Sequence, residues 1–338
     1  MNIIGIESSC DETSAAVICN NKIVSNLIYS QDIHEKYGGV VPELSSRAHL
    51  QKVLPLVKKS LDEAGLKLNQ VDLICATAGP GLIGALLVGL TFAKGYAYSC
   101  NKPFVAVNHI EGHIFSGFLM DDKPEFPFLC LVVSGGHTLL LLVEGFTQIK
   151  KLGSTIDDAA GEAFDKVSKL LGLGYPGGVK IQNIALNQKT DFADFPVAQC
   201  KNEFDFSFSG VKTSVLRFIQ KEFEKPENIP VDLLPLIAAS FQKSVVKALI
   251  DKTEKALRRF NIKSLSLVGG VAANQMLRLG FQELSVRYKK KLVIPDFRFC
   301  GDNGAMIAFR GMQLHEVGIR NSLDFNAYPS LKDNTFIN

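Results

Sequence analysis

Two histidines four residues apart have a spacing that can serve metal chemistry. His109 and His113 lie in the segment Asn108-His109-Ile110-Glu111-Gly112-His113. On a helix, residues four apart share one face, so both imidazole rings can reach one cation. Imidazole suits first-row transition metals. The spacing alone is equally typical of surface or capping histidines, and Gly112 weakens the helix, so other features must decide.

Carboxylates at two other points could complete such a site. Asp302 precedes the last predicted helix, where it would either cap that helix or act as the third ligand of a two-histidine, one-carboxylate site. The turn Glu7-Ser8-Ser9-Cys10-Asp11-Glu12-Thr13 holds three carboxylates and three hydroxyls. Such a turn can be polar simply because it is exposed to solvent. Three carboxylates beside a phosphate-binding turn would instead favour binding of a metal or an amine.

Two glycine turns have the form of phosphate-binding sites. An apolar strand runs into Ser134-Gly135-Gly136-His137, and a second strand leaves; successive backbone amides there can form an anion-binding nest. The second turn, Gly269-Gly270, joins a strand to a helix whose first turn holds Asn274, and a helix N-terminus favours negative charge. Each turn alone could be an ordinary connection. Two of them together with a histidine pair favour a nucleotide and a metal.

Strands and helices alternate along the chain, which predicts an α/β fold. Predicted strands cover residues 3–7, 14–19, 22–29, 71–77, 104–107, 128–134, 138–143, 264–268 and 292–294; predicted helices cover 42–64, 81–99, 159–171, 233–260, 272–286 and 303–316. Residues 174–230 are rich in Gly, Pro, Asn and Asp and are predicted to be irregular surface segments. The residues after Asn321 are predicted to be poorly ordered.

Each half of the chain opens with strand, polar turn and strand, which indicates a structural duplication. The charged stretch 121–125 marks the predicted boundary. We therefore expect an N-terminal lobe at residues 1–124, a C-terminal lobe with inserted loops at 125–320, and a tail at 321–338. The length of 338 residues suits two domains of about 150 residues.

Composition is that of an ordinary globular protein, with 46% hydrophobic and 21% charged residues. A net charge of +3 permits a nucleic-acid partner without arguing for one. The sequence begins without a basic, secretory-type leader, and no apolar run approaches the ~20 residues that span a bilayer. The seven cysteines are dispersed without a CxxC pair, which is typical of reduced thiols. These features predict a cytoplasmic protein without a membrane segment.

At these positions the sequence resembles the bacterial tRNA adenosine threonylcarbamoyltransferase family, long mislabelled O-sialoglycoprotein endopeptidase. The matching stretches run in family order and are specific as a set: residues 5–13, 37–44, 77–82, 108–113, 133–138, 156–166, 175–178, 205–213, 269–271 and 302–306. The resemblance implies the duplicated, two-lobed fold of the actin, Hsp70 and sugar-kinase superfamily, with the active site in the cleft between lobes. It also implies transfer of a threonylcarbamoyl group from threonylcarbamoyl-adenylate to the exocyclic amine of the adenosine next to the anticodon, in tRNAs that read codons starting with A.

The resemblance also implies residue roles and partners. By family pattern, one divalent metal, Fe2+ in preference to Zn2+, is held by His109, His113 and Asp302. The adenylate pocket is lined by Val132, Val133, Ser134, Gly135, Gly136, Asp165, Gly178 and Asn274. Two protein partners are implied: an inactive paralogue that pairs with the N-terminal lobe, and a small P-loop ATPase. As a hypothesis, Asp11 or Glu12 positions or deprotonates the adenine amine.

Three positions depart from the family pattern. Gly301 stands where Thr is common, Val179 where Pro is common, and Gln182 where many members carry Asp or Ser. The last two put the contacts to the sugar in doubt, not the metal site.

Other functions remain open from the residues alone. A metal-dependent glycoprotease would need a base next to the first histidine, and Glu111 is misplaced for that role. A small-molecule kinase of the same superfamily would transfer a phosphate. A non-catalytic scaffold would need neither the histidine pair nor the glycine turns.

Two basic clusters could contact tRNA. One contains Arg287, Lys289, Lys290 and Lys291, and the other contains Arg258 and Arg259. Such clusters are more often solvated helix faces. With so small a net charge, we expect partner subunits to contribute to the tRNA surface.

Overall fold

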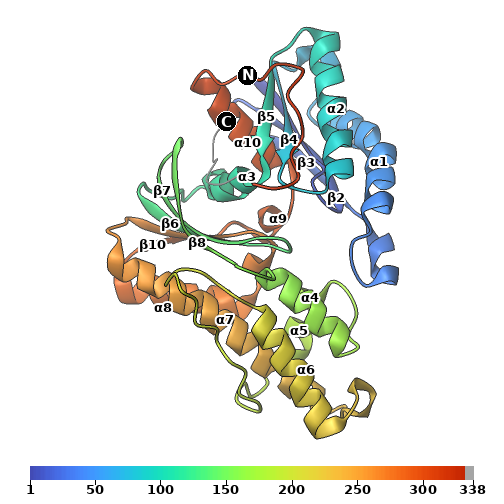
Figure 1. Cartoon of the computed structure of the whole chain (residues 1–338). Coiled ribbons are helices and arrows are strands. Elements are labelled where there is room, and N and C mark those ends of the chain that lie inside the picture. The colour runs from blue at the N-terminus through green and yellow to red at the C-terminus, as the bar shows by residue number, and fades with distance from the viewer. Residues whose placement is uncertain (332–338) are drawn as a thin grey trace. The chain divides into compact units, whose positions relative to one another are not determined.

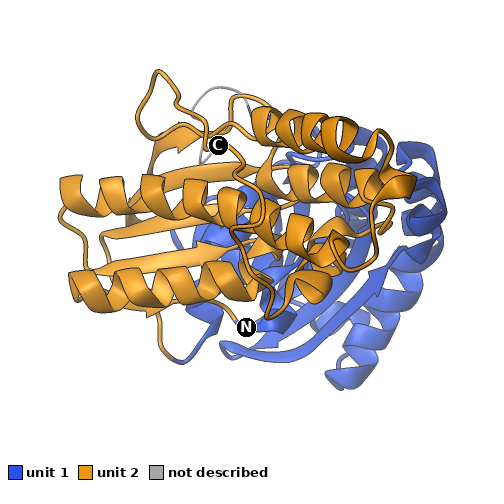
Figure 2. Cartoon of the chain, turned by 90° about the horizontal axis from the view of Figure 1, so that it is seen from below, with its two compact units in different colours: residues 1–121, 296–338 blue, residues 122–295 orange. Residues whose placement is uncertain are grey.

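The structure is a computed structural model that describes residues 1–331. The chain divides into two compact units (Figure 2). Unit 1 contains residues 1–121 together with the chain from residue 296 onward, and unit 2 contains residues 122–295. Each unit is built on its own five-stranded mixed sheet.

The sheet of unit 1 has the strand order β3-β2-β1-β4-β5. Strands β1, β2 and β3 are antiparallel neighbours, whereas β1, β4 and β5 run parallel. The bounds of the strands are β1 Asn2–Glu7, β2 Glu12–Cys19, β3 Lys22–Ser30, β4 Leu73–Gly79 and β5 Phe104–Asn108. The helices of unit 1 are α1 Pro42–Glu63, α2 Ile83–Cys100, α3 His109–Phe115, α9 Phe297–Cys300 and α10 Gly304–Glu316, with short 3-10 helices at Asp32–Tyr37, Leu68–Gln70 and Ser116–Leu119.

Both faces of this sheet are covered, because successive strand residues point to opposite sides. Ile4 belongs to an apolar cluster with residues of α1 and α2, such as Val57 and Leu90. Its neighbour Ile3 belongs to a second cluster, with Met306 and Ile307 of α10. Helices α1 and α2 therefore cover one face and α10 covers the other (Figure 1).

Helix α2 is the one helix among the described residues that is long and apolar enough to cross a membrane by length and composition. Leu90, Ala93 and Tyr96 of this helix are buried in the cluster that also contains α1 residues. Such burial is typical of a core helix in a folded unit.

Unit 2 repeats the same topology, which confirms the predicted duplicated α/β fold. Its sheet has the order β10-β9-β6-β7-β8, with β6, β7 and β8 antiparallel and β6, β9 and β10 parallel. The strands are β6 Phe128–Val133, β7 Thr138–Gly145, β8 Gln148–Ser154, β9 Ser264–Val268 and β10 Lys291–Val293. The helices are α4 Ala160–Leu170, α5 Gly177–Ala185, α6 Ser209–Phe223, α7 Leu234–Arg259 and α8 Gln275–Tyr288, with 3-10 helices at Pro226–Asn228 and Gly270–Ala273.

The C-terminal part of the chain departs from the expected division into lobes. Residues 296–320 were assigned to the second lobe by sequence, yet the structure places them in unit 1. The reason is close packing of α10 on the first sheet. A Cβ on Gly5 would lie 2.3 Å from the Gly304 carbonyl oxygen, and one on Gly311 would lie 2.2 Å from Cys75 Sγ. No residue with a side chain fits at these contacts.

Two segments that were expected to be irregular are ordered. Residues 174–230 contain α5 and α6. Part of the expected tail is also ordered, because the Tyr328 amide donates to the Ala78 carbonyl at 2.9 Å and the Asn321 amide donates to Phe104 at 3.0 Å. The composition of both segments resembles that of loops and gives no indication of the tertiary contacts that fix them. The expected tail beyond residue 331 lies outside the described residues.

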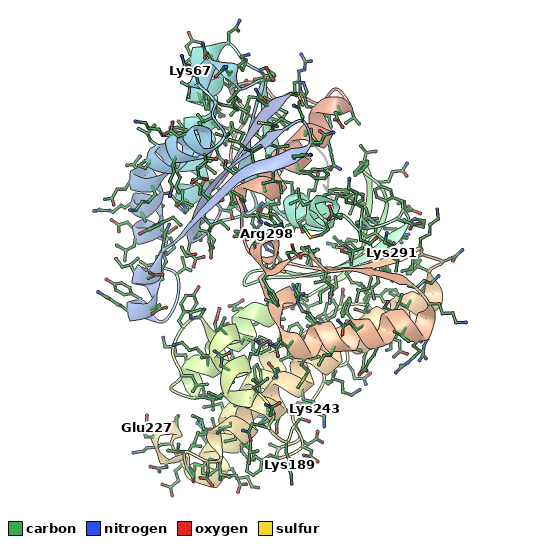
Figure 3. The ribbon with its side chains drawn as sticks, turned by 180° about the vertical axis from the view of Figure 1, so that it is seen from behind. Lys67, Lys189, Glu227, Lys243, Lys291 and Arg298 are labelled. Carbon is green, nitrogen blue, oxygen red and sulfur yellow. The ribbon has the colours of Figure 1, made fainter. Side chains whose placement is uncertain are left out.

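The basic clusters are largely paired with acidic side chains. Lys291 lies at the start of β10 (Figure 3). It contacts the carboxylate of Asp122 at 2.5 Å. Arg287 contacts Glu254 at 3.0 Å, and Arg258 contacts the same carboxylate at 2.9 Å. These contacts fit the solvated-face interpretation better than a preformed nucleic-acid surface.

Candidate functional site

The candidate metal centre lies at one edge of the unit 1 sheet. Parallel strands β1, β4 and β5 end there at Glu7, Gly79 and Asn108. In α/β sheets, ligands bind at the carboxyl ends of parallel strands. Helix α3 starts directly after β5, because the Asn108 side chain accepts hydrogen bonds from the amides of Ile110 at 2.9 Å and Glu111 at 3.2 Å.

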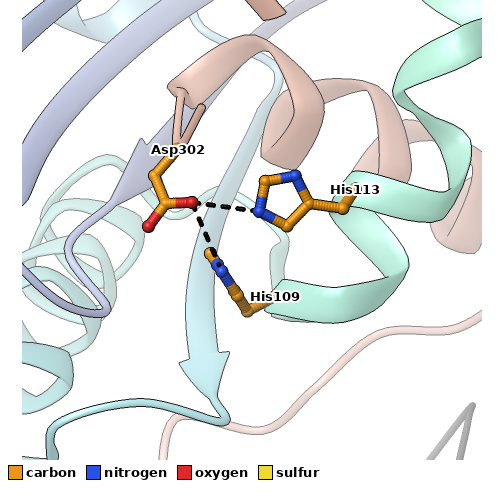
Figure 4. A group of neighbouring side chains, drawn as sticks. All are labelled: His109, His113 and Asp302. Carbon is orange, nitrogen blue, oxygen red and sulfur yellow. Dashed lines mark hydrogen bonds and ion pairs between the residues drawn. The ribbon is translucent and has the colours of Figure 1, made fainter. Parts of the chain in front are cut away.

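The structure brings His109, His113 and Asp302 together, although Asp302 is far away in sequence (Figure 4). Asp302 Oδ1 lies 3.0 Å from His113 Nε2 and 3.5 Å from His109 Nε2. One potential ligand atom from each residue lies within 4.8 Å of the others. Both histidines are buried, as expected for a site shielded from solvent.

Glu7, one of the three carboxylates of the acidic turn, is a further member of this site, in a role that the sequence did not specify. Its carboxylate is fully buried. Glu7 Oε2 lies 3.0 Å from His109 Nδ1 and accepts from the Thr77 hydroxyl at 2.6 Å. A buried carboxylate that faces the outer ring nitrogen of a histidine is the usual arrangement around a metal ligand, because it fixes the ring's orientation. The sequence placed Glu7 in an acidic turn that could serve a metal, but it did not predict the contact with His109.

The electrostatics of the centre favour a cation. Although burial lowers the pKa of His109, the carboxylates of Asp302 and Glu7 raise it to about 9. Burial, and then repulsion from Asp302 and Asp11, raises the pKa of Glu12 well above its ordinary value. Crowded carboxylates of this kind are relieved by a positive charge.

The donor set also fits a metal ion. His113 is fully buried, and its Nε2 lies 3.0 Å from Asp302 Oδ1, so these two atoms could share one ion. Two imidazoles and a carboxylate are a ligand set for divalent transition metals, with positions left for substrate. The site geometry therefore meets the chemical requirements of the centre predicted from sequence.

Asp302 is held by the start of α10 but does not cap it. Asn303 is the capping residue, and its side chain accepts from the Met306 amide at 3.0 Å. The Ser14 hydroxyl accepts from the Gly304 amide at 2.7 Å. The capping role considered for Asp302 is thus filled by its neighbour, and the Asp302 carboxylate faces the histidines.

The acidic turn between β1 and β2 is anchored by α1. The Cys10 carbonyl accepts from Ser45 Oγ and from His49 Nε2, the latter at 2.9 Å. His49 Nδ1 lies 2.8 Å from the Thr13 hydroxyl, and burial lowers the pKa of His49. Asp11 and Glu12 therefore sit on a turn fixed at both ends. His49 carried no signal in the sequence.

In unit 2 the Gly135-Gly136 turn is open, whereas in the second predicted turn a Cβ on Gly269 would lie 2.4 Å from the Val133 carbonyl oxygen and only Gly270 has open space. The Ser134 amide donates to the His137 carbonyl at 2.8 Å and closes the β6–β7 turn. Gly135 and Gly136 are exposed, with open space where a Cβ would stand. A Cβ on Gly161 would lie 2.5 Å from the Ser134 carbonyl oxygen, so the first turn of α4 packs against this turn.

The other residues predicted to line the adenylate pocket have partial structural roles. Asn274 caps α8 through the Leu277 amide at 3.1 Å and donates to Gln242 at 2.7 Å. Asp165 Oδ1 accepts from the Gly177 amide at 2.7 Å. Gly178 has open space at its Cβ position, whereas Val132 and Val133 are buried strand residues.

Two positions that depart from the family pattern are also placed in unit 2. Gln182 Oε1 accepts from the Gln275 amide at 2.8 Å, which links α5 to the start of α8. The side chain of Val179 is exposed.

The repeated sheet topology defines a duplicated α/β protein with the fold that the resemblance predicted, that of the actin, Hsp70 and sugar-kinase superfamily. Two solved structures share the fold. HypF from T. kodakarensis is 15% identical, with a TM-score of 0.64 over 93% of this chain and 48% of its own. The (R)-2-hydroxyglutaryl-CoA dehydratase component A of Acidaminococcus fermentans is 13% identical, with a TM-score of 0.54 over 93% and 98%.

Sequence comparison identifies the family. The family model described as tRNA N6-adenosine threonylcarbamoyltransferase matches residues 22–309. Proteins of that name from Thermosipho africanus and Dictyoglomus turgidum are 48% and 49% identical, over 98% of this chain and 100% and 98% of their own. The chain belongs to the tRNA N6-adenosine threonylcarbamoyltransferase family and is an enzyme of the transferase class. These similarities support the transferase, not the glycoprotease or kinase alternative.

Proposed function

We propose that the chain transfers the threonylcarbamoyl group from threonylcarbamoyl-adenylate to the exocyclic amine of the adenosine adjacent to the anticodon, in tRNAs that read codons starting with A. The observation that carries the proposal is the buried cluster of His109, His113 and Asp302 at the carboxyl edge of the unit 1 sheet. Membership of the family supplies the reaction class.

One divalent cation would be held by His109, His113 and Asp302. Two histidines and one carboxylate form the ligand set of many non-haem Fe(II) sites, so Fe2+ is favoured over Zn2+. The cation would supply Lewis-acid polarisation of the donor's carbonyl or phosphate oxygen. The buried Glu7 carboxylate, 3.0 Å from His109 Nδ1, orients the ring whose other nitrogen faces Asp302.

The adenylate part of the donor would bind to unit 2. Gly135, Gly136 and Gly178 offer backbone without side chains in open space. Phosphate oxygens can approach such backbone closely and accept bonds from its amides. Asn274 caps the start of α8, and Asp165, which lies within α4, accepts from the Gly177 amide at the start of α5.

Asp11 and Glu12 would act on the acceptor amine. The anchored turn would hold both carboxylates near the proposed metal ligands, since the hydroxyl of Ser9 in the same turn lies 3.2 Å from His109 Nδ1. An adenine amine is a weak nucleophile, so orientation and removal of its proton contribute much of the rate.

tRNA is the macromolecular substrate in this proposal. The paired state of Arg287 and Lys291 supports a tRNA surface that is completed by other subunits. We propose two such partners, an inactive paralogue bound to the N-terminal lobe and a small P-loop ATPase. The enzyme would act in the cytoplasm without a membrane partner.

Reconstitution tests the function directly. The chain is combined with a threonylcarbamoyl-adenylate synthase, both partner subunits, threonine, bicarbonate, ATP and tRNA, and the digested nucleosides are analysed by mass spectrometry. We expect threonylcarbamoyladenosine to form, to disappear with chelator and to return with added Fe2+. Absence of the product with active synthase present would refute the proposal.

A further inference from the structure

A buried ion pair joins the two elements that carry the candidate metal ligands. Arg310 on α10 donates to Glu111 Oε2 on α3, from Nε at 2.8 Å and from Nη2 at 2.6 Å. Both side chains are 1% exposed. Helix α3 supplies His109 and His113, and Asp302 lies just before the start of α10.

Stability alone is a weak explanation for this pair. Removing two charges from water costs several kcal/mol, and well-packed apolar replacements of buried ion pairs are often neutral or stabilising. A documented use of buried polar groups is to select one register between packed elements. Register is what matters where two helices must place ligands around one ion.

The pair is placed on the face of α3 that does not carry the metal ligands. Glu111 lies two residues from each histidine, and residues two apart point about 200° away from each other around a helix. The same face bears Phe115, one turn further on, whose ring centroid lies 4.3 Å from the Arg310 guanidinium carbon. The guanidinium is thereby held by two points, one turn apart, on α3.

Packing beside the pair is tight enough to transmit its position. A Cβ on Gly112 would lie 3.0 Å from Ile307 Cδ1 and 3.2 Å from Met306 Cγ, so the backbone of α3 lies against α10. Helix α3 has seven residues, and a helix of this length has little intrinsic stability. Tertiary contacts must therefore fix the rotation of α3 about its axis and its position along that axis.

We propose that Arg310 is a positioning residue for the metal centre: its bond to Glu111 sets the rotation of α3 against α10, and with it the placement of the two imidazoles around Asp302. The proposal rests on the proposed metal-dependent function. It predicts that cation affinity and ligand geometry depend on this pair separately from the stability of the fold.

Co2+ binding to the full chain tests this, because Co2+ gives an absorption spectrum that reports ligand geometry. We expect Arg310→Met to raise the Kd for Co2+ by about 10- to 100-fold, the usual effect of losing groups that orient metal ligands. We expect the visible absorption band of Co2+ bound to Arg310→Met to be weaker than that of Co2+ bound to the wild type. Arg310→Lys, which keeps the charge but loses the two-point contact, should lie between Arg310→Met and the wild type.

A double variant separates position from stability. Glu111→Gln with Arg310→Met removes both charges, so it should recover melting temperature relative to Arg310→Met while its Co2+ affinity stays low. Leu61→Ala is the matched control, because Leu61 is buried in the cluster on the other face of the sheet. It should lower the melting temperature and leave the Co2+ spectrum unchanged.

Two results would overturn the proposal: wild-type Co2+ affinity and spectrum in the double variant, or an equal loss of affinity in Leu61→Ala. Failure of the proposed function looks different. There, wild type and His113→Ala would bind Co2+ equally, which would show that the cation does not use these residues at all.

Discussion

The two units share one topology, yet their candidate sites are built in opposite ways. In unit 1, side chains from β1, α3 and the loop before α10 converge, and Glu7, His109 and His113 are buried. In unit 2, the corresponding turn after the first strand offers Gly135 and Gly136, with open space beside their backbone. The candidate site in unit 1 is made of side chains, whereas the turn in unit 2 exposes backbone because its glycines have no side chains.

The difference fits what each site is proposed to bind, a divalent cation in unit 1 and a phosphate in unit 2. A small divalent cation needs several ligand atoms within a few ångströms, and only side chains from separate elements can supply them. A phosphate is larger and is recognised by backbone amides, which any side chain would obstruct. Truncating side chains should therefore damage unit 1, whereas adding a methyl group should damage unit 2.

The largest effect is expected from removal of a proposed metal ligand. We expect His113→Ala or Asp302→Ala to lower the rate of transfer by about 10³-fold, because polarisation by a bound metal is worth several kcal/mol. Metal content measured by mass spectrometry should fall in parallel. Adding imidazole to His113→Ala is the control, and partial recovery is expected. A His113→Ala variant that is fully active without bound metal would contradict the proposed metal site in unit 1.

A smaller effect is expected from the acidic turn. If Glu12 accepts a proton, Glu12→Gln should slow single-turnover transfer by about 10²-fold without changing donor affinity. Because burial and neighbouring carboxylates raise the pKa of Glu12, its protonated, inactive form persists to higher pH than usual. The rate should therefore rise with pH in the wild type and be flatter in the variant. An unchanged rate would assign this turn to structure alone.

In unit 2 the informative change is the addition of a methyl group to the glycine turn. Gly136→Ala places a methyl group in open space, so the fold should keep its melting temperature. The Kd for AMP should nevertheless rise about ten-fold, equivalent to ~1.4 kcal/mol, because the methyl group obstructs approach of the phosphate. Gly95→Ala in α2 is the control, since Gly95 is also exposed with open space. Equal AMP binding in both variants would count against the phosphate role of the turn.

Local pattern was sufficient to predict most elements, because the strands are apolar runs bounded by turns. The family motifs predicted that His109, His113 and Asp302 lie together, as they do in the structure. The pattern failed where long-range contacts decide. Helices α5 and α6 were missed because their polar composition resembles loops, and the fixed position of Tyr328 depends on the distant Ala78 carbonyl.

The same reason explains why the roles of Glu7 and His49 were not predicted. Glu7 and His49 act through partners such as His109 and the Cys10 carbonyl, and no short motif encodes those distances. The assignment of residues 296–320 to the second lobe failed because glycines carry no hydrophobic signal. Gly5 and Gly304 nevertheless permit the close packing that draws α10 onto the first sheet.

The smallest effect is expected at the basic cluster of unit 2, which belongs to neither site. Arg287 is paired with Glu254, and Lys291 with Asp122. We expect Arg287→Gln or Lys291→Gln to change the KM for tRNA by less than about two-fold, since exposed ion pairs contribute about 0–1 kcal/mol. The dependence of binding on salt should also keep its slope, because each lost phosphate contact would reduce that slope by about one. The measurement is made with the partner subunits present. A reduced slope in Lys291→Gln would show that tRNA displaces Asp122 from Lys291. Unit 2 would then bind phosphate through side chains as well as through backbone.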